Sequence, residues 1–97
     1  MVREIRWSSR ADRDREEIET YWINRNKSNT YSLKLDQLFR QNIDLLVKIP
    51  EMGKTTKFPG VRFIIVLDYL VYYRATSAAI EIITIWDSRR NPKKFKL

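Results

Sequence analysis

Three runs rich in Ile, Val, Tyr and Phe follow one another in the second half of the chain, at residues 61–67, 69–75 and 80–87. Short breaks at residues 68–69 and 77–79 separate the runs. Aromatic and β-branched residues favour strands, and consecutive strands with short links pair most simply as neighbours. The pattern therefore predicts an antiparallel meander of three strands.

The N-terminal part of the chain predicts a short strand and a helix. Residues 2–7 alternate imperfectly between apolar and charged side chains, as a short strand does. Ser9 followed by Asp12 resembles a capping box, so we expect a helix over residues 11–26. Mixed charges on the rest of this helix indicate a solvated face. Its apolar stripe is predicted at Ile18, Tyr21 and Trp22.

A second helix follows the turn at residues 27–30 and stops at Pro50. Two helices with a short link form an αα-hairpin, and the C-terminal sheet is the large partner for its apolar stripes. Residues 50–60 are expected to be one extended loop. The prediction is a single α+β domain over residues 1–97, with the order β-α-α-β-β-β and a helical hairpin on a small, mainly antiparallel sheet. The second stripe recurs at three- and four-residue steps, at Tyr31, Leu35, Leu38, Phe39, Ile43, Leu46 and Ile49.

Composition excludes several kinds of site. The 97 residues are 43% apolar, which fits one folded domain, and they include neither cysteine nor histidine. Disulfides, thiolate catalysis and thiolate metal sites are excluded, so we expect no metal and no cofactor. The N-terminus lacks the apolar core of a secretory signal, and no run approaches the length that spans a bilayer. We therefore expect a cytoplasmic protein without membrane contact.

Positive charge is concentrated toward the C-terminus. The formal net charge is +7, and residues 51–97 hold nine basic and four acidic side chains. This distribution predicts a surface that binds a polyanion or an acidic protein, and a solubilising tail is the other interpretation. We expect Arg62 and the tail to meet on one patch. The tail carries Arg89, Arg90, Lys93, Lys94 and Lys96 without any acid.

Several motifs keep a characteristic order and spacing: Leu45–Pro50 with a Pro-x-x-Gly step to Gly53, Gly60-Val61-Arg62, Tyr72-Tyr73-Arg74, and Ile85–Pro92. In this order they resemble the RelE/ParE superfamily of type II toxin–antitoxin toxins. The resemblance implies a small growth-inhibiting toxin of the kind linked to plasmid stabilisation. It also implies that a cognate antitoxin silences the toxin, and that the pair contacts promoter DNA only as a complex.

The superfamily has two activities. RelE-like toxins cut messenger RNA in the ribosomal A site, whereas ParE-like toxins poison DNA gyrase. By motif position, Arg62 and Arg89 match the phosphate-contacting arginines of RelE-like toxins; the other interpretation is that Arg62 pairs with a carboxylate or a backbone carbonyl on the sheet. Further basic candidates for target or phosphate binding are Arg90, Lys93 and Lys94, with Lys54 and Lys57 in the loop.

Groups for proton transfer are less evident. Phe95 stands where RelE-like toxins commonly have a tyrosine, and a tyrosine near its usual pKa of about 10 is a poor base. The sequence therefore favours the ParE-like branch and a gyrase poison. Ribosome-dependent mRNA cleavage remains the alternative, and a degenerate toxin that acts only in antitoxin pairing and promoter binding is a third. The remaining acid/base candidates are Tyr69, Tyr72, Tyr73, Glu51, Asp68 and Asp87.

Two expectations concern the core. Side chains alternate along a strand, so one of the neighbours Tyr72 and Tyr73 is expected to face inward. Trp86 is expected in the core because it is four residues from Ile82 on the same strand. Trp22 is expected there as part of the first helix's stripe.

Overall fold

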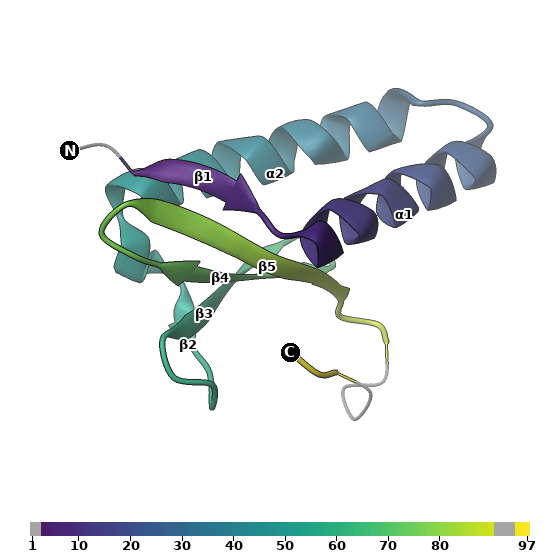
Figure 1. Ribbon diagram of the computed structural model, residues 1–97. Helices are drawn as coiled ribbons and strands as arrows, with labels where there is room; N and C mark the ends of the chain where they lie inside the picture. Colours follow the sequence, from purple (N-terminus) through teal and green to yellow (C-terminus); the bar gives the residue numbers. More distant parts are fainter. Residues whose placement is uncertain (1–2, 91–94) are drawn as a thin grey trace.

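Two helices pack on one face of a five-stranded sheet in the computed structural model, which describes residues 3–90 and 95–97 (Figure 1). The predicted α+β class and the order β-α-α-β-β-β are confirmed, and a two-residue strand, β2, is added within the predicted loop. The elements are β1 (Glu4–Trp7), α1 (Ser9–Asn26), α2 (Thr30–Lys48), the 3-10 turn η1 (Pro50–Met52), β2 (Lys54–Thr55), β3 (Val61–Val66), β4 (Tyr69–Ala75) and β5 (Ala79–Asp87).

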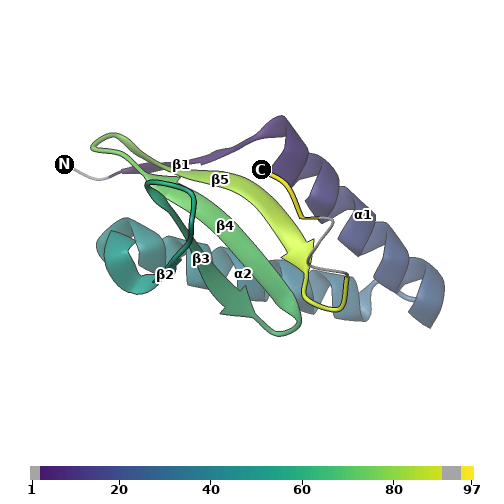
Figure 2. The same cartoon turned by 90° about the horizontal axis from the view of Figure 1, so that it is seen from below.

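The sheet has the strand order β1-β5-β4-β3-β2; in the view from below, α2 lies behind the strands and α1 lies beside β5 (Figure 2). β1 runs parallel to β5, and the other neighbouring pairs are antiparallel. Both outer strands are short. β1 ends at Trp7 opposite Ile82, and β2 pairs only with Arg62 and Phe63 of β3. The last residues of β5 and of β3 therefore need other partners.

A bulge in β5 decides which side chains face the helices. Between Tyr72 and Tyr73 of β4 the pairing skips Ile83 of β5. An extra residue reverses the alternation of faces beyond it. Trp86 consequently lies on the face away from the helices, so the prediction that it shares the core face of Ile82 is wrong. Tyr73 is fully buried, which confirms that one of the two adjacent tyrosines belongs to the core.

Ser8 begins the first helix and joins it to the sheet. Its Oγ accepts a hydrogen bond from the backbone N–H of Ala11 at 3.0 Å and donates to the carbonyl oxygen of Ile83 at 2.6 Å. The N-cap is therefore Ser8 and not Ser9, and the predicted capping box with Asp12 is not formed, because the residue three positions after Ser8 is Ala11. A serine at this position satisfies a backbone N–H that the first helical turn leaves unpaired.

The core lies between α2 and the sheet. The predicted stripe of α2 is confirmed except at Ile49, which is 52% exposed because α2 ends at Lys48 and the chain turns into η1. Tyr21 was predicted on the stripe of α1, yet it is 47% exposed, whereas Ile18 and Trp22 pack against the core. The innermost side chains of α2 are Leu35, Phe39, Ile43 and Leu46, each at most 1% exposed.

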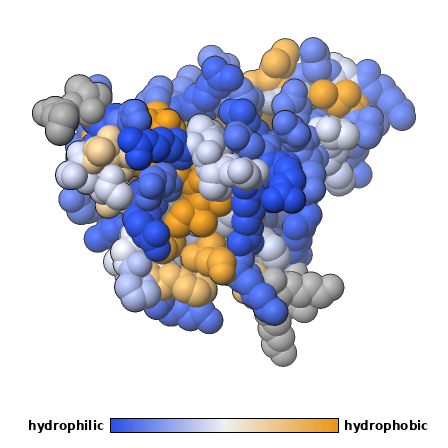
Figure 3. Space-filling view, in the orientation of Figure 1, coloured by the Kyte–Doolittle hydropathy of each residue, from blue (hydrophilic) through white to orange (hydrophobic). Residues whose placement is uncertain are grey.

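The face drawn in the space-filling view is mostly hydrophilic (Figure 3). In the space-filling view, apolar side chains gather in the middle and lower part of the face shown, between hydrophilic flanks (Figure 3). Across residues 3–90 and 95–97, neither helix has the length and apolar character needed to cross a membrane.

Candidate functional site

Arg62 of β3 holds the loop that follows α2. Its Nη1 donates to the carbonyl oxygens of Gly53 at 2.9 Å and Glu51 at 3.3 Å. The side chain is half-buried, and the residue pairs with Tyr73 of β4. Arg62 therefore binds backbone carbonyls, but they belong to the segment between α2 and β2 and not to the sheet, where the sequence-based interpretation expected them. This nitrogen is directed at the loop, so it is already engaged within the fold.

Tyr73 fixes the same loop from the core. Its hydroxyl donates to the carbonyl oxygen of Pro50 at 2.6 Å and accepts from the backbone N–H of Gly53 at 2.9 Å. Burial raises the pKa of Tyr73 above its usual value, so the hydroxyl keeps its proton. Gly53 is required by this contact, because a Cβ there would lie 2.6 Å from the tyrosine oxygen. The Pro-x-x-Gly step in the sequence thus has a packing reason.

Arg89 forms a bidentate ion pair just beyond β5. Its Nε and Nη2 donate to the two carboxylate oxygens of Asp87 at 2.9 and 2.8 Å. These bonds hold the pKa of Asp87 below its usual value, so Asp87 stays ionised. The guanidinium carbon also lies 5.9 Å from the ring centroid of Trp22 on α1. Arg89 is thereby oriented while half of its side chain remains exposed.

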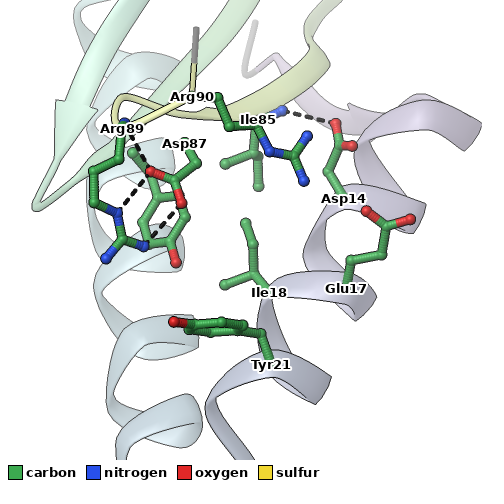
Figure 4. Close-up of a pocket in the computed structure, with 9 residues that line it drawn as sticks. Asp14, Glu17, Ile18, Tyr21, Ile85, Asp87, Arg89 and Arg90 are labelled. Carbon is green, nitrogen blue, oxygen red and sulfur yellow. Dashed lines mark hydrogen bonds and ion pairs between the residues drawn. The ribbon is translucent and has the colours of Figure 1, made fainter. Parts of the chain in front are cut away.

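A hollow of about 290 Å³ lies beside this pair, between α1 and the end of β5 (Figure 4). Glu17 and Tyr21 line it from α1, and Arg89 and Arg90 line it from the opposite side. Its rim is acidic on the helix and basic on the C-terminal segment. The apolar part of the lining consists of Ile18, Ile85 and Tyr69.

Arg62 and Arg89 lie toward opposite ends of the sheet. Arg62 pairs with Tyr73, whereas Asp87 pairs with Tyr69 at the other end of β4. Tyr69 and Tyr73 are four residues apart, which is about 13 Å along β4. Because β3 and β5 lie on either side of β4, two strand spacings add about 10 Å across the sheet. The expected single patch is therefore not formed by these arginines. In the sequence, Arg62 and Arg89 stand near the start and just after the end of the meander. Only the pairing of the strands shows that they lie at opposite ends of the sheet.

The other predicted basic residues are dispersed. Lys54 is exposed on β2, and Lys57 is exposed in the following loop, with Nζ 5.4 Å from the ring centroid of Phe58. Arg90 is exposed beside the hollow. Lys93 and Lys94 lie outside the described residues.

Asp14 is a structural residue that sequence analysis missed. Its carboxylate accepts from the backbone N–H of Ile85 at 3.0 Å and from the hydroxyl of Thr84. These groups belong to the part of β5 that β1 does not reach. Asp14 therefore takes the place of a strand partner. Asp14 belongs to a segment of mixed charge whose pattern indicates a solvent-exposed helix face. Nothing in the sequence distinguishes it from its charged neighbours.

Exposed apolar side chains gather at the other incomplete edge. Within the described residues, no strand pairs with residues 64–66 on the side of β2. Ile65 and Met52 are 56% and 40% exposed and line one hollow of about 220 Å³ beside this edge. Leu45 in the last turn of α2 and Ile49 just after the helix are exposed as well. Over residues 3–90 and 95–97, no cluster of three or more acidic residues that could hold a metal ion is formed.

Solved structures share this architecture. A chain of the chromosomal ParDE toxin–antitoxin system from P. aeruginosa superimposes with a TM-score of 0.73 and 20% identity, covering 87% of this chain and 94% of that chain. A chain of the E. coli DinJ–YafQ toxin–antitoxin complex superimposes with a TM-score of 0.55 and 12% identity, covering 88% and 91%. At these identities the likeness shows the fold.

Sequence comparison defines the family. No curated protein sequence matches this chain. The family model described as the ParE toxin of the type II toxin–antitoxin system, parDE, matches residues 5–92. That span includes both helices, strands β2 to β5, all of β1 except Glu4, and the Arg89 ion pair. The chain therefore belongs to the ParE toxin family of type II toxin–antitoxin systems.

Proposed function

We propose that this ParE-family toxin inhibits growth by binding and poisoning DNA gyrase, and that a cognate antitoxin neutralises it. Family membership supports the toxin role, and both structural relatives come from toxin–antitoxin assemblies. The gyrase-contacting surface is proposed at the end of β5, where Arg89 is held outward and Arg90 is exposed. Lys93 and Lys94 continue this basic segment in the sequence.

The engagement of Arg62 and Tyr73 within the fold is the observation that carries this proposal. RNA cleavage by a 2′-hydroxyl needs a base, an acid and a group that stabilises the phosphorane. Arg62 and Tyr73 instead hold the segment from Pro50 to Gly53. Burial also raises the pKa of Tyr72, so less of its hydroxyl is ionised at neutral pH and available as a base than in an ordinary tyrosine.

Asp87 is equally unsuited to proton transfer. Its hydrogen bonds from Arg89 lower its pKa, and an acid that stays ionised cannot protonate a leaving oxygen. The pair is better suited to presenting a guanidinium in a fixed direction. A pre-oriented arginine loses less side-chain entropy when it binds a partner. This favours a contact residue over a catalytic one.

The antitoxin is proposed to cover the open edge of β3. An extended segment can add a strand there and bury Ile65 and Met52 in alternate side-chain positions. The formal net charge of +7 favours an acidic partner, because opposite charge speeds encounter. Duplex promoter DNA would then be contacted only by the toxin–antitoxin complex.

Induction of the toxin without its antitoxin, followed by separate assays of plasmid topology and translation, tests the proposal. We expect plasmid DNA cleaved and trapped by gyrase, and weaker toxicity in the double variant Arg89→Ala, Arg90→Ala. Arg40→Ala is the matched control, because Arg40 is 69% exposed on α2 and, among the residues that the structure describes, its ion-pair partner is Asp36. Intact plasmid topology together with A-site cuts that vanish in Arg62→Ala would establish mRNA cleavage instead. Harmless overexpression would identify a degenerate toxin.

A further inference from the structure

A second hollow of about 290 Å³ lies on the face of the sheet turned away from the helices. Phe63, Tyr72 and Trp86 form its floor from three adjacent strands, β3, β4 and β5. The loop between β2 and β3 forms one wall, and Phe95 of the C-terminal segment forms another. Both segments descend from the sheet on the side opposite the helices (Figure 1). Arg90 of the proposed gyrase contact borders this hollow through Trp86, whereas Arg89 does not line it.

The aromatic rings form a continuous row. The centroids of Phe63 and Tyr72 are 5.5 Å apart with an interplanar angle of 38°, and those of Tyr72 and Phe95 are 4.5 Å apart at 32°. Trp86 meets Phe95 edge-on at 5.1 Å. All four side chains are half-buried, so each keeps part of its ring open to solvent. The bulge at Ile83 creates this row, because it turns Trp86 to the outer face.

Cationic side chains surround the aromatic row. Lys57 lines the hollow itself, and Lys54 pairs with Phe63 on the adjoining strand. Arg90 lies with its guanidinium carbon 5.5 Å from the ring centroid of Trp86. None of the described residues that line the hollow is acidic. A concave site with a rim of one charge sign attracts the opposite charge.

We propose that this hollow binds a base of a single-stranded nucleic acid, with the base stacked on the aromatic row and the neighbouring phosphates facing Lys57 and Lys54. Stacking platforms flanked by positive charge bind single strands in this way without reading their sequence. A duplex keeps its bases within the helix, so the site favours unpaired strands. An apolar side chain of a partner protein also fits an aromatic floor, but a cationic rim suits a polyanion better.

Fluorescence anisotropy with labelled 12-mers tests the proposal. The probes are oligo-dT, oligo-dA, oligo-rU and oligo-rA, with a DNA duplex of equal length for comparison. We expect single strands to bind more tightly than the duplex, and the DNA and RNA probes show which sugar is preferred. Tyr72→Leu should weaken single-strand binding about fivefold to a hundredfold, the range expected for the loss of one stacked base.

Lys57→Ala supplies a test that does not depend on the core, because Lys57 is exposed. We expect it to reduce the slope of log affinity against log salt by about 0.7, as for one phosphate contact on a single strand. The control, Arg40→Ala, removes the same charge from the helical side. Equal slopes for both variants would overturn the proposal, even if Tyr72→Leu failed to fold.

One further outcome would also overturn it. If Tyr72→Leu and Lys57→Ala weaken antitoxin binding and leave oligonucleotide affinity unchanged, the hollow binds a protein side chain. Trapping of gyrase is measured separately, so failure of this inference leaves the proposed function standing.

Discussion

Removal of a single buried hydroxyl, in Tyr73→Phe, tests whether this tyrosine is an anchor of the fold. The side chain is fully buried, and its hydroxyl joins Pro50 and Gly53 through two hydrogen bonds. Phenylalanine keeps the ring that packs in the core. The substitution therefore isolates the contribution of the hydroxyl.

The magnitude follows from the groups left behind. A typical intramolecular hydrogen bond contributes about 0.5–1.5 kcal/mol, and a buried donor left without a partner costs about 1–3 kcal/mol. Gly53 is itself buried, so its N–H has little access to water in the variant. We expect the free energy of unfolding to fall by about 2–4 kcal/mol, a large part of the stability of a small domain.

Urea denaturation at neutral pH measures this difference. Tyr21→Phe is the matched control, because Tyr21 is 47% exposed, and we expect a change below about 0.5 kcal/mol. A loss below about 0.5 kcal/mol in Tyr73→Phe would refute the anchoring role. A variant of normal stability with abolished toxicity would point instead to proton transfer.

Alkaline pH gives an independent reading of the same hydroxyl. Burial raises the pKa of Tyr73 in the folded state, whereas the unfolded chain titrates near the usual value of about 10. The neutral hydroxyl therefore contributes stability that is fully present below pH about 10 and is lost as the pH rises through the folded pKa. As the pH rises above about 10, we expect the free energy of unfolding to fall less in Tyr73→Phe than in the parent chain.

Three further substitutions test local features, each by its midpoint in urea. Gly53→Ala should destabilise by about 1–3 kcal/mol, because the added methyl group would meet the Tyr73 hydroxyl at 2.6 Å. Asp14→Ala should cost about 1–3 kcal/mol, since it leaves the Ile85 N–H without its carboxylate acceptor, and an unchanged midpoint would show that water replaces it. Leu67→Asn should stabilise by up to about 1 kcal/mol, because Leu67 has a φ of 55° and asparagine adopts this conformation more readily.

The fold was predictable where a regular period dominates. The stripe of α2 and the three runs of the meander recur at helix and strand spacings, and the structure has both elements there. The edges of these patterns were not predictable. Ile49 continues the period yet lies beyond the end of α2, and Tyr21 lies on the border of its stripe. A hydrophobic period reports which face can be buried, not where the partner surface ends.

The bulge shows a different limit. One extra residue, Ile83, changes the face of Trp86, and no local feature of the strand reveals it. The aromatic hollow therefore could not be predicted from the sequence, although Tyr72 is one of its acid/base candidates. The positions of the two candidate arginines were likewise not predictable from local sequence. Arg62 and Arg89 were identified as candidates from motifs, but their separation depends on strand pairing.

Incubation of the purified toxin with gyrase, ATP and supercoiled plasmid, followed by detergent and protease, tests the central claim most directly. The account predicts linear DNA that increases with toxin concentration, and less of it with the variant Arg89→Ala, Arg90→Ala than with Arg40→Ala. Supercoiling that proceeds without linear DNA, at toxin concentrations that stop translation in a parallel extract, would contradict it.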